Sequence, residues 1–153
     1  MNNVEKMQTS EPFDTLTVET EDILTFPGGL LGFEEFKRYV IVEEEACAPF
    51  KWLISADEPG LGFPIVPIER VYPTYKRSIL QEVLRKEQRR DREHLLTYVI
   101  VTLENPLERS TVNLKGPLVV DPYRRVGRQL VLTSGDYPTD YPIIREQGVG
   151  SKE

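Results

Sequence analysis

The chain has 153 residues, a net charge of −6 at pH 7, 39% hydrophobic and 29% charged residues. These values describe one soluble globular domain with its own core, and they exclude a disordered chain. A single cysteine, Cys47, excludes an internal disulfide, and no apolar run approaches the roughly 20 residues that a membrane helix needs. The first residues lack the apolar segment of a secretion signal, so the sequence predicts a cytoplasmic protein.

The amino-terminal region begins with polar residues that show no periodic pattern. We therefore predict a flexible extension over residues 1–13, a single domain over 14–145, and a flexible tail over 146–153. Two strands, or a hairpin, are predicted at 15–19 and 23–26, and the Pro-Gly-Gly sequence that follows breaks the second of them.

Three further strands are predicted in the next part of the chain, at 38–42, 50–55 and 63–68. The first is apolar on both faces and ends in three glutamates. The third contains Pro64 and Pro67, which cannot donate a hydrogen bond to a neighbouring strand. This strand is therefore predicted to lie at an edge of the sheet or to contain a bulge.

One short helix is predicted around residues 78–92. Ser78 and Gln81 have the spacing of a capping box, and an apolar stripe follows at Ile79, Leu80 and Val83. Residues 76–94 hold seven basic and four acidic residues. A solvated helix face is one interpretation, and an RNA-binding β module that uses residues 76–92 on phosphates is the alternative. Acidic residues interrupt the basic ones and no aromatic side chain lies among them, which favours the first interpretation.

The densest strand signals lie in the last third of the chain. Runs rich in β-branched and apolar residues at 98–103, 111–114, 118–120 and 130–133 are separated by turns that contain Gly or Pro. The first run is apolar on both faces and should be a central strand. Because these turns leave no room for crossover helices, the sequence predicts a mainly β fold, a compact antiparallel β roll or barrel-like single domain.

Side chains that could carry catalysis are scarce. His94 is the single histidine and Cys47 the single cysteine, which excludes the common zinc sites and any site that needs two histidines. His94 lies in a charged segment, where a surface histidine is expected rather than a member of a catalytic triad. We therefore predict that the protein is not an enzyme and has no catalytic, cofactor-binding or metal-binding residues.

Acidic residues are concentrated at the amino-terminal end. Residues 1–45 contain eleven acidic and three basic residues, whereas the remainder is slightly basic. Such a surface repels nucleic acid and attracts a basic partner, although it can also serve solubility alone. The candidate partner-binding residues are the acidic side chains of three short segments: Glu19, Glu21, Asp22, Glu34, Glu35, Glu43, Glu44 and Glu45.

Three segments carry a resemblance to a known family: TFPGGLLGFEEFKRYVIV (25–42), PFKWLISADEPGLGFPIVPI (49–68) and VIVTLENPLERSTVNLKGPLVVDPYRRVGRQLVLTSGDYP (99–138). In their order and spacing they resemble the flagellar assembly factor FliW family. The sequence differs from the usual family pattern at Leu31, Pro64 and Tyr141, and in the basic rather than acidic character of residues 76–94.

The resemblance implies a non-enzymatic, barrel-like monomer that binds two proteins in turn. One expected partner is flagellin, bound near its helical termini, and the other is the translational regulator CsrA, which would then no longer repress flagellin mRNA. Neither direct nucleic-acid binding nor membrane binding is implied. The acidic first third of the chain agrees with attraction of an RNA-binding protein such as CsrA.

Overall fold

The computed structural model describes residues 4–8, 15–87, 94–133 and 137–143. One α-helix, four short 3-10 helices (η) and eleven strands lie within these residues. They are β1 (Val4–Gln8), β2 (Thr15–Glu19), η1 (Thr20–Asp22), β3 (Leu24–Thr25), β4 (Arg38–Glu43), η2 (Glu45–Cys47), β5 (Lys51–Ser55), β6 (Gly62–Pro67), η3 (Ile68–Arg70), α1 (Tyr75–Glu87), β7 (Leu96–Thr102), η4 (Leu107–Arg109), β8 (Thr111–Val112), β9 (Leu118–Asp121), β10 (Val126–Gln129) and β11 (Tyr141–Pro142).

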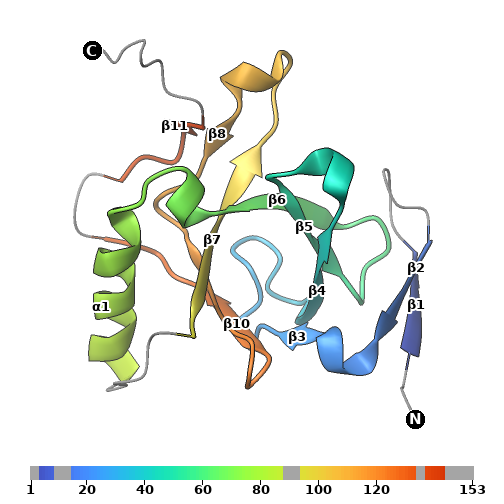
Figure 1. Cartoon of the computed structure of the whole chain (residues 1–153). Coiled ribbons are helices and arrows are strands. Elements are labelled where there is room, and N and C mark those ends of the chain that lie inside the picture. The colour runs from blue at the N-terminus through green and yellow to red at the C-terminus, as the bar shows by residue number, and fades with distance from the viewer. Residues whose placement is uncertain (1–3, 9–14, 88–93, 134–136, 144–153) are drawn as a thin grey trace.

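The sheet closes on itself. β3, β4, β5, β6 and β7 pair in sequence order, β7 also pairs with β9, β9 with β10, and β10 with β3, which completes the ring (Figure 1). The β3–β10 pair is parallel, and the other pairs between described strands are antiparallel. A closed barrel leaves no free edge within the ring. The predicted mainly β, barrel-like fold is confirmed.

Two apolar cores lie on opposite faces of this sheet. The barrel interior holds the aromatic and aliphatic side chains Phe26, Leu30, Tyr39, Leu53, Ile65, Tyr98, Leu118 and Val120. The outer core lies under the helix and contains Tyr75, Ile79 and Val83 of α1 together with Val99, Val101 and Val119 of the sheet. Because side chains alternate along a strand, β7 contributes to both cores, as predicted for a central strand.

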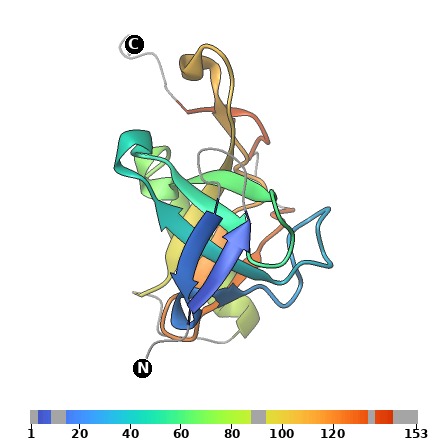
Figure 2. The ribbon, with the colours of Figure 1, turned by 90° about the vertical axis from the view of Figure 1, so that its right-hand side faces the viewer.

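The first strand contradicts the predicted extension over residues 1–13. Val4–Gln8 form β1, which pairs antiparallel with β2 from Val4↔Glu19 to Gln8↔Thr15. The hairpin lies across the outer face of β4 and β5 (Figure 2), where Val18 contacts the cluster around Val40 and Ile54. Pairing with β2, which carries Val18 onto this apolar patch, is the physical reason for the strand. Of the two alternatives predicted for residues 15–19 and 23–26, two successive strands are observed rather than a hairpin, since β3 pairs with β4 in the barrel.

The prediction that residues 63–68 form an edge or bulged strand is wrong. β6 lies between β5 and β7. Its two prolines are tolerated because of where the pairing ends: β6 pairs with β7 from Ile65 to Pro67, so Pro64 lies before this pairing and Pro67 is its last residue. Pro64 does lie inside the β5–β6 ladder, opposite Trp52, so it is the ladder with β7 that has no proline in its middle.

The helix begins three residues earlier than predicted. Tyr75, which is fully buried, starts the apolar face that continues through Ile79 and Val83, so Ser78 lies inside the first turn and does not cap the helix. α1 ends at Glu87 among the described residues, and residues 88–92 of the predicted helix lie outside them. No helix in the described ranges is long and apolar enough to cross a membrane.

The last predicted strand is shifted towards the amino terminus. Strand β10 covers Val126–Gln129 rather than residues 130–133. The predicted residues still run beside the preceding segment, since the Leu130 N–H donates to Pro117 O (2.8 Å) and the Leu132 N–H to Lys115 O (2.9 Å). Leu130 and Leu132 belong to the outer core, which explains why their apolar pattern resembled a strand.

A tight turn between β9 and β10 brings the ring to closure. Asp121 Oδ1 accepts the backbone N–H groups of Tyr123 (3.1 Å) and Arg124 (3.2 Å), and Asp121 O accepts that of Arg125 (2.8 Å). Arg125 adopts a left-handed conformation (φ 57°) and its carbonyl accepts the Thr25 N–H (3.0 Å). The turn therefore directs β10 onto β3.

Gly127 allows the same junction to close inside the barrel. A Cβ atom at this position would lie 2.5 to 2.9 Å from three ring atoms of Phe26. That ring is fully buried and packs edge-on against Tyr39, with centroids 5.4 Å apart, so it has no free space into which to move.

We expect Gly127→Ala to destabilise the protein by about 1–3 kcal/mol, because the added methyl group overpacks a closed core. Gly28→Ala is the matched control, since a methyl group added there would meet no atom within 4 Å beyond its own chain neighbours. Urea denaturation of both variants measures the difference. Equal stabilities for the two would show that the Phe26 contact does not restrict the barrel.

The Asp121 carboxylate should make stability depend on pH. Burial by itself would raise its pKa, but hydrogen bonds from the Arg124 N–H, His94 and the Tyr123 N–H outweigh burial and lower it. A lowered pKa in the folded state means that the ionised carboxylate stabilises the fold above the ordinary aspartate pKa of about 4, and that this stabilisation disappears as pH falls through the folded-state pKa.

Asp121→Asn keeps the side-chain oxygen but removes the charge. We expect it to lower the free energy of unfolding by about 1 kcal/mol at pH 7, and the gap to the unmodified protein should narrow below about pH 4. Urea denaturation across this range tests the expectation. A gap of constant size would show that the charge of Asp121 does not stabilise the turn.

Candidate functional site

Two adjoining hollows form a groove beside the end of β4 and the start of β5. The first has a volume of about 480 Å³ and the second about 200 Å³, and both are lined by Ala48, Pro49, Phe50 and Arg70. We call this surface the acidic groove. Its remaining lining residues are Glu43, Glu44, Glu45, Lys51 and Pro67 in the first hollow, and Val66, Val71, Leu107 and Ile143 in the second.

Acidic side chains border one side of the groove because β4 ends there. Glu43 is the last residue of the strand, and its carboxylate forms an ion pair with Lys51, its partner in the β4–β5 register. Glu44 and Glu45 follow in the turn that leads into η2, and both are exposed. Lys51 balances Glu43. The exposed Arg70 also lines both hollows, so Glu44 and Glu45 leave the lining with a net charge of only −1.

The floor of the second hollow is apolar. Leu107, in η4, is 51% exposed, and Phe50, Val71 and Ile143 are partly exposed. Exposed apolar side chains gathered in a hollow with charged residues at its border are typical of a protein-binding surface. An amphipathic helix whose polar face is basic would fit both parts of the groove.

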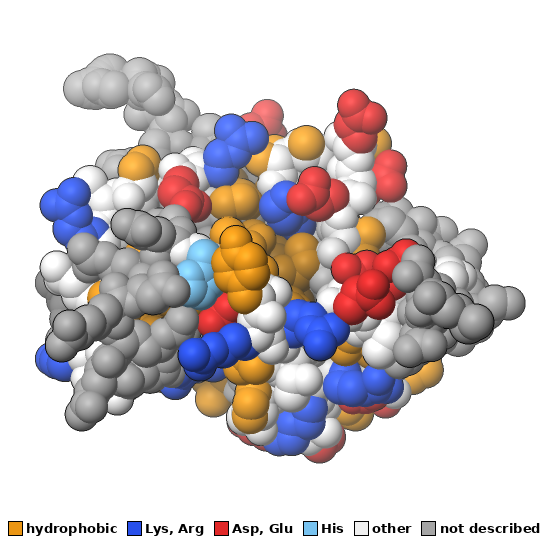
Figure 3. All heavy atoms as spheres, turned by 60° about the horizontal axis from the view of Figure 1, so that its bottom comes forward, with side chains coloured by type: hydrophobic (Ala, Val, Ile, Leu, Met, Phe, Trp, Pro, Cys, Tyr) orange, Lys and Arg blue, Asp and Glu red, His pale blue; other side chains and the backbone are white. Residues whose placement is uncertain are grey.

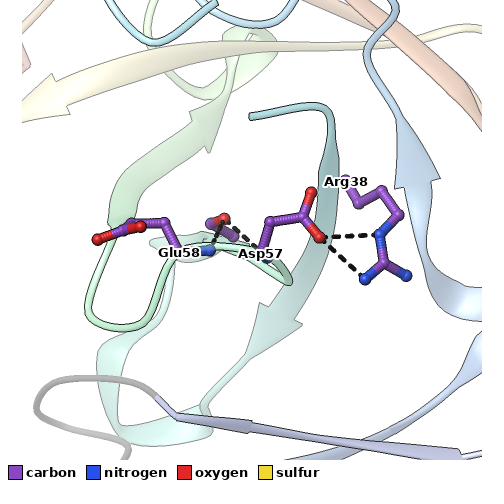
Figure 4. Close-up of polar contacts among 4 residues, drawn as sticks. Arg38, Asp57 and Glu58 are labelled. Atoms are coloured by element: carbon purple, nitrogen blue, oxygen red, sulfur yellow. Dashed lines mark hydrogen bonds and ion pairs between the residues drawn. The ribbon is translucent and has the colours of Figure 1, made fainter. Parts of the chain in front are cut away.

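The other candidate acidic residues lie elsewhere. Glu19, Glu21 and Asp22 lie at and just after the end of β2, in a turn at the lower edge of Figure 1, whereas η2 lies near its top. Arg38, at the other end of β4 from Glu43, pairs with Asp57 (Nε–Oδ1 2.9 Å), and the Ser55 hydroxyl accepts the N–H groups of Asp57 and Glu58 (Figure 4). The acidic residues predicted as candidates for partner binding therefore lie in separate places on the barrel.

Glu34 and Glu35 belong to a loop, residues 27–37, that protrudes from one end of the barrel (Figure 2). The Glu34 carboxylate accepts the Gly32 N–H (3.0 Å), and this hydrogen bond lowers its pKa. The Leu31 N–H donates to the Gln129 side chain (2.8 Å), which itself donates to Gly116 O (3.0 Å). The loop is thus held in place with Leu31 68% exposed at its tip.

The basic helix offers little free charge among its described side chains. Arg85 and Lys86 both lie beside the carboxylate of Glu82, at 3.2 and 3.5 Å. Arg77 is exposed. The basic residues at 89, 90 and 92, on which the RNA-binding alternative also depends, lie outside the described residues. The structure therefore adds no support to that alternative.

The groove floor was not predicted from the sequence. The sequence predicts a strand that begins at Phe50, without indicating that Phe50 is partly exposed, and it does not single out Leu107 or Ile143. Sequence gives no reliable signal for exposure of an isolated apolar residue. The proline before Leu107 did mark a turn, and turns lie at the surface. Among the described residues there is no group of three or more His, Cys, Asp or Glu side chains that could hold a metal ion.

Comparison with known proteins places this barrel in a family. The family model described as FliW protein matches residues 6–143. The chain belongs to the FliW family. Flagellar assembly factor FliW of Leptospira biflexa is 39% identical over 146 residues, which cover 94% of this chain and 95% of that protein. Flagellar assembly factor FliW of Natranaerobius thermophilus is 34% identical over 145 residues, covering 94% and 96% of the two chains.

A solved FliW structure confirms the architecture. The crystal structure of the flagellar assembly factor FliW superposes with a TM-score of 0.82 at 30% identity, covering 94% of this chain and 99% of that one. The departures from the usual FliW pattern are local here: Leu31 lies at an exposed loop tip, Pro64 before the β6–β7 pairing, and Tyr141 stacks on Tyr72 with ring centroids 5.5 Å apart. None of the three disrupts the FliW barrel.

Proposed function

We propose that this protein is a non-enzymatic flagellar assembly factor of the cytoplasm that binds flagellin and the translational regulator CsrA. Membership of the FliW family supports the general role, and the relatives named above are flagellar assembly factors. The acidic groove is the observation that carries the proposal at the level of residues. It joins an exposed apolar floor to the exposed carboxylates of Glu44 and Glu45 on a scaffold that has no free barrel edge.

Flagellin would use the floor of the groove. Its terminal segments are amphipathic and become helical on assembly, so a hollow lined by Phe50, Leu107 and Ile143 can bind their apolar face before assembly takes place. Binding would order these segments at an entropic cost, which apolar burial in the hollow offsets.

CsrA would use the acidic border. An RNA-binding protein presents basic surface, and Glu44 and Glu45 provide the complementary charge. Because both partners would approach the same groove, they would exclude each other, and the factor freed from flagellin would relieve CsrA-dependent repression of flagellin translation. Glu19, Glu21, Asp22, Glu34 and Glu35 remain candidates for CsrA contact from their own positions, as a second and weaker part of the proposal.

For flagellin, we expect Leu107→Asp to weaken the complex about tenfold or more, since it places a charge in the apolar floor. Val131→Asp is the matched control, because Val131 is similarly exposed, at 48%, and does not line the groove. Calorimetry and gel filtration with monomeric flagellin measure both variants. If only the Val131 variant lost the complex, the flagellin-binding site would have to lie on another surface, outside the acidic groove.

For CsrA, we expect Glu44→Lys with Glu45→Lys to slow association and to reduce its dependence on salt. Exposed charge changes of this kind cost less than about 0.5 kcal/mol of stability each. Glu21→Lys with Asp22→Lys is the matched pair away from the groove, and Arg77→Gln with Arg85→Gln should leave binding intact. Surface plasmon resonance at two salt concentrations separates these variants.

Two results would contradict the CsrA assignment. If the Glu44 and Glu45 changes had no effect while the arginine changes abolished binding, α1 would be the contact. If the protein bound flagellin mRNA directly and the arginine changes prevented it, the RNA-binding alternative would hold.

A further inference from the structure

The turn between β9 and β10 carries a concentration of positive charge that the proposed function does not use. Residues 122–129 include Arg124, Arg125 and Arg128, all exposed, and no acidic residue. Tyr123, at the tip, is 79% exposed. We call residues 122–128 the basic turn. It lies at the lower edge of Figure 1, on the opposite side of the barrel from η2 and the acidic groove.

The basic turn is preorganised. The three hydrogen bonds to Asp121, which is only 4% exposed, fix its backbone, and the Arg125 carbonyl is held by β3. A partner that binds here would order few protein groups, which reduces the entropic cost of binding.

Tyr123 is also held in place despite its exposure. Its ring packs against His94 with centroids 5.0 Å apart and planes at 67°. His94 Nε2 lies 3.4 Å from Asp121 Oδ1, so the histidine is fixed by the same carboxylate that organises the turn. Figure 3 shows this face of the molecule, where apolar side chains, Lys and Arg side chains and several Asp and Glu side chains surround the histidine. A rigid aromatic side chain with an exposed face is a common anchor in protein interfaces.

A small hollow of about 150 Å³ lies next to the basic turn, between α1 and the β9–β10 hairpin. Its apolar lining comes from Val83, Leu95 and Val119. Asp121, Arg124 and Arg128 also line it, and Arg124 Nε lies 3.9 Å from Asp121 Oδ2. Its size suits a single aliphatic side chain. The arrangement therefore offers an apolar anchor point with guanidinium groups beside it, which can bind carboxylates through two parallel hydrogen bonds.

We propose that the basic turn is a second protein-binding surface, which takes a short acidic peptide segment with one apolar side chain. The apolar side chain occupies the hollow, Arg124 and Arg128 bind the flanking carboxylates, and Tyr123 covers the segment. Because this surface and the acidic groove lie on different sides of the barrel, both can be occupied at once.

Several features favour an acidic peptide over RNA. The floor of the hollow is formed by the aliphatic side chains of Val83, Leu95 and Val119, which an apolar side chain can contact and a phosphate cannot. Tyr123 is one aromatic side chain, whereas single-stranded nucleic acid is usually bound along a row of stacking residues and cations. The net charge of −6 also disfavours a long polyanion more than a short segment.

Fluorescence anisotropy with labelled probes tests the proposal on the full chain. The main probe is a short peptide with one leucine between aspartates and glutamates. A second peptide replaces the leucine with glycine, and a single-stranded uridine oligonucleotide is the RNA probe. We expect the leucine peptide to bind, the glycine peptide to bind about tenfold more weakly because the anchor is lost, and the oligonucleotide to bind more weakly than the leucine peptide.

Charge reversal locates the surface. Arg124→Glu with Arg128→Glu should weaken the leucine peptide by about tenfold or more. Arg77→Glu with Arg109→Glu changes two exposed arginines outside the basic turn and should alter affinity by less than about twofold. Tyr123→Ala changes the most exposed side chain of the basic turn and should weaken binding without affecting folding. It takes the place of the Arg124→Glu, Arg128→Glu variant if that protein does not fold.

Any of four results overturns the proposal. They are no binding of the leucine peptide at low salt, equal affinity for the two peptides, equal losses in the basic-turn and control variants, and tighter binding of the oligonucleotide than of the leucine peptide. The last result would assign the basic turn to RNA. None of these measurements involves flagellin or CsrA, so this proposal can fail while the proposed function stands.

Discussion

The contact between the ring of Phe26 and the backbone of Gly127 is the constraint on which the barrel depends. β3 and β10 are far apart in the sequence and pair in parallel at a single register position, Val126↔Thr25. Such a short pairing provides little hydrogen bonding by itself. The barrel stays closed there because an aromatic ring fills the interior where the opposing residue has no side chain. Closure then fixes the two ends of the barrel, and with them every surface considered as a binding site.

Much of the architecture could be predicted from sequence pattern. Alternation and turn residues identified β4, β5, β7 and β9, and apolar character on both faces of β7 correctly indicated a central strand. These signals are local, so they identify a strand even when its neighbours in the fold are unknown. The parallel pairing of β3 with β10 could not be predicted, because it depends on the conformation of Arg125 in a turn about a hundred residues away along the chain.

The failures have related causes. Val4–Gln8 become a strand only because β2 is there to pair with them. β6 carries two prolines and is still central, because the ladder with β7 begins after one proline and ends at the other. In each case the tertiary context decides whether the segment forms a strand and where the strand lies in the sheet, whereas strand propensity reflects the segment alone.

The charge pattern of the sequence identified acidic residues, but it did not show where on the barrel they lie. The sequence identified the acidic segments, but it could not show that β4 carries Glu43 to one end of the barrel while Arg38, paired with Asp57, stays at the other. Nor could it show that apolar side chains from three distant segments, at Phe50, Leu107 and Ile143, meet beside those glutamates. Exposure of an apolar residue is decided by the packing of its neighbours, which local pattern does not contain.

The position of β7 also has a consequence for how the protein comes apart. Its residues pair with β6, β8 and β9, and its two faces belong to the barrel interior and to the core under α1. Neither core can therefore open without exposing the other to water. The two should melt in one cooperative transition rather than as separate units, and the amide protons of β7 should be among the slowest to exchange with solvent. If the two proposed surfaces bind their partners, the barrel would thus remain a single rigid body while either surface is occupied or vacated.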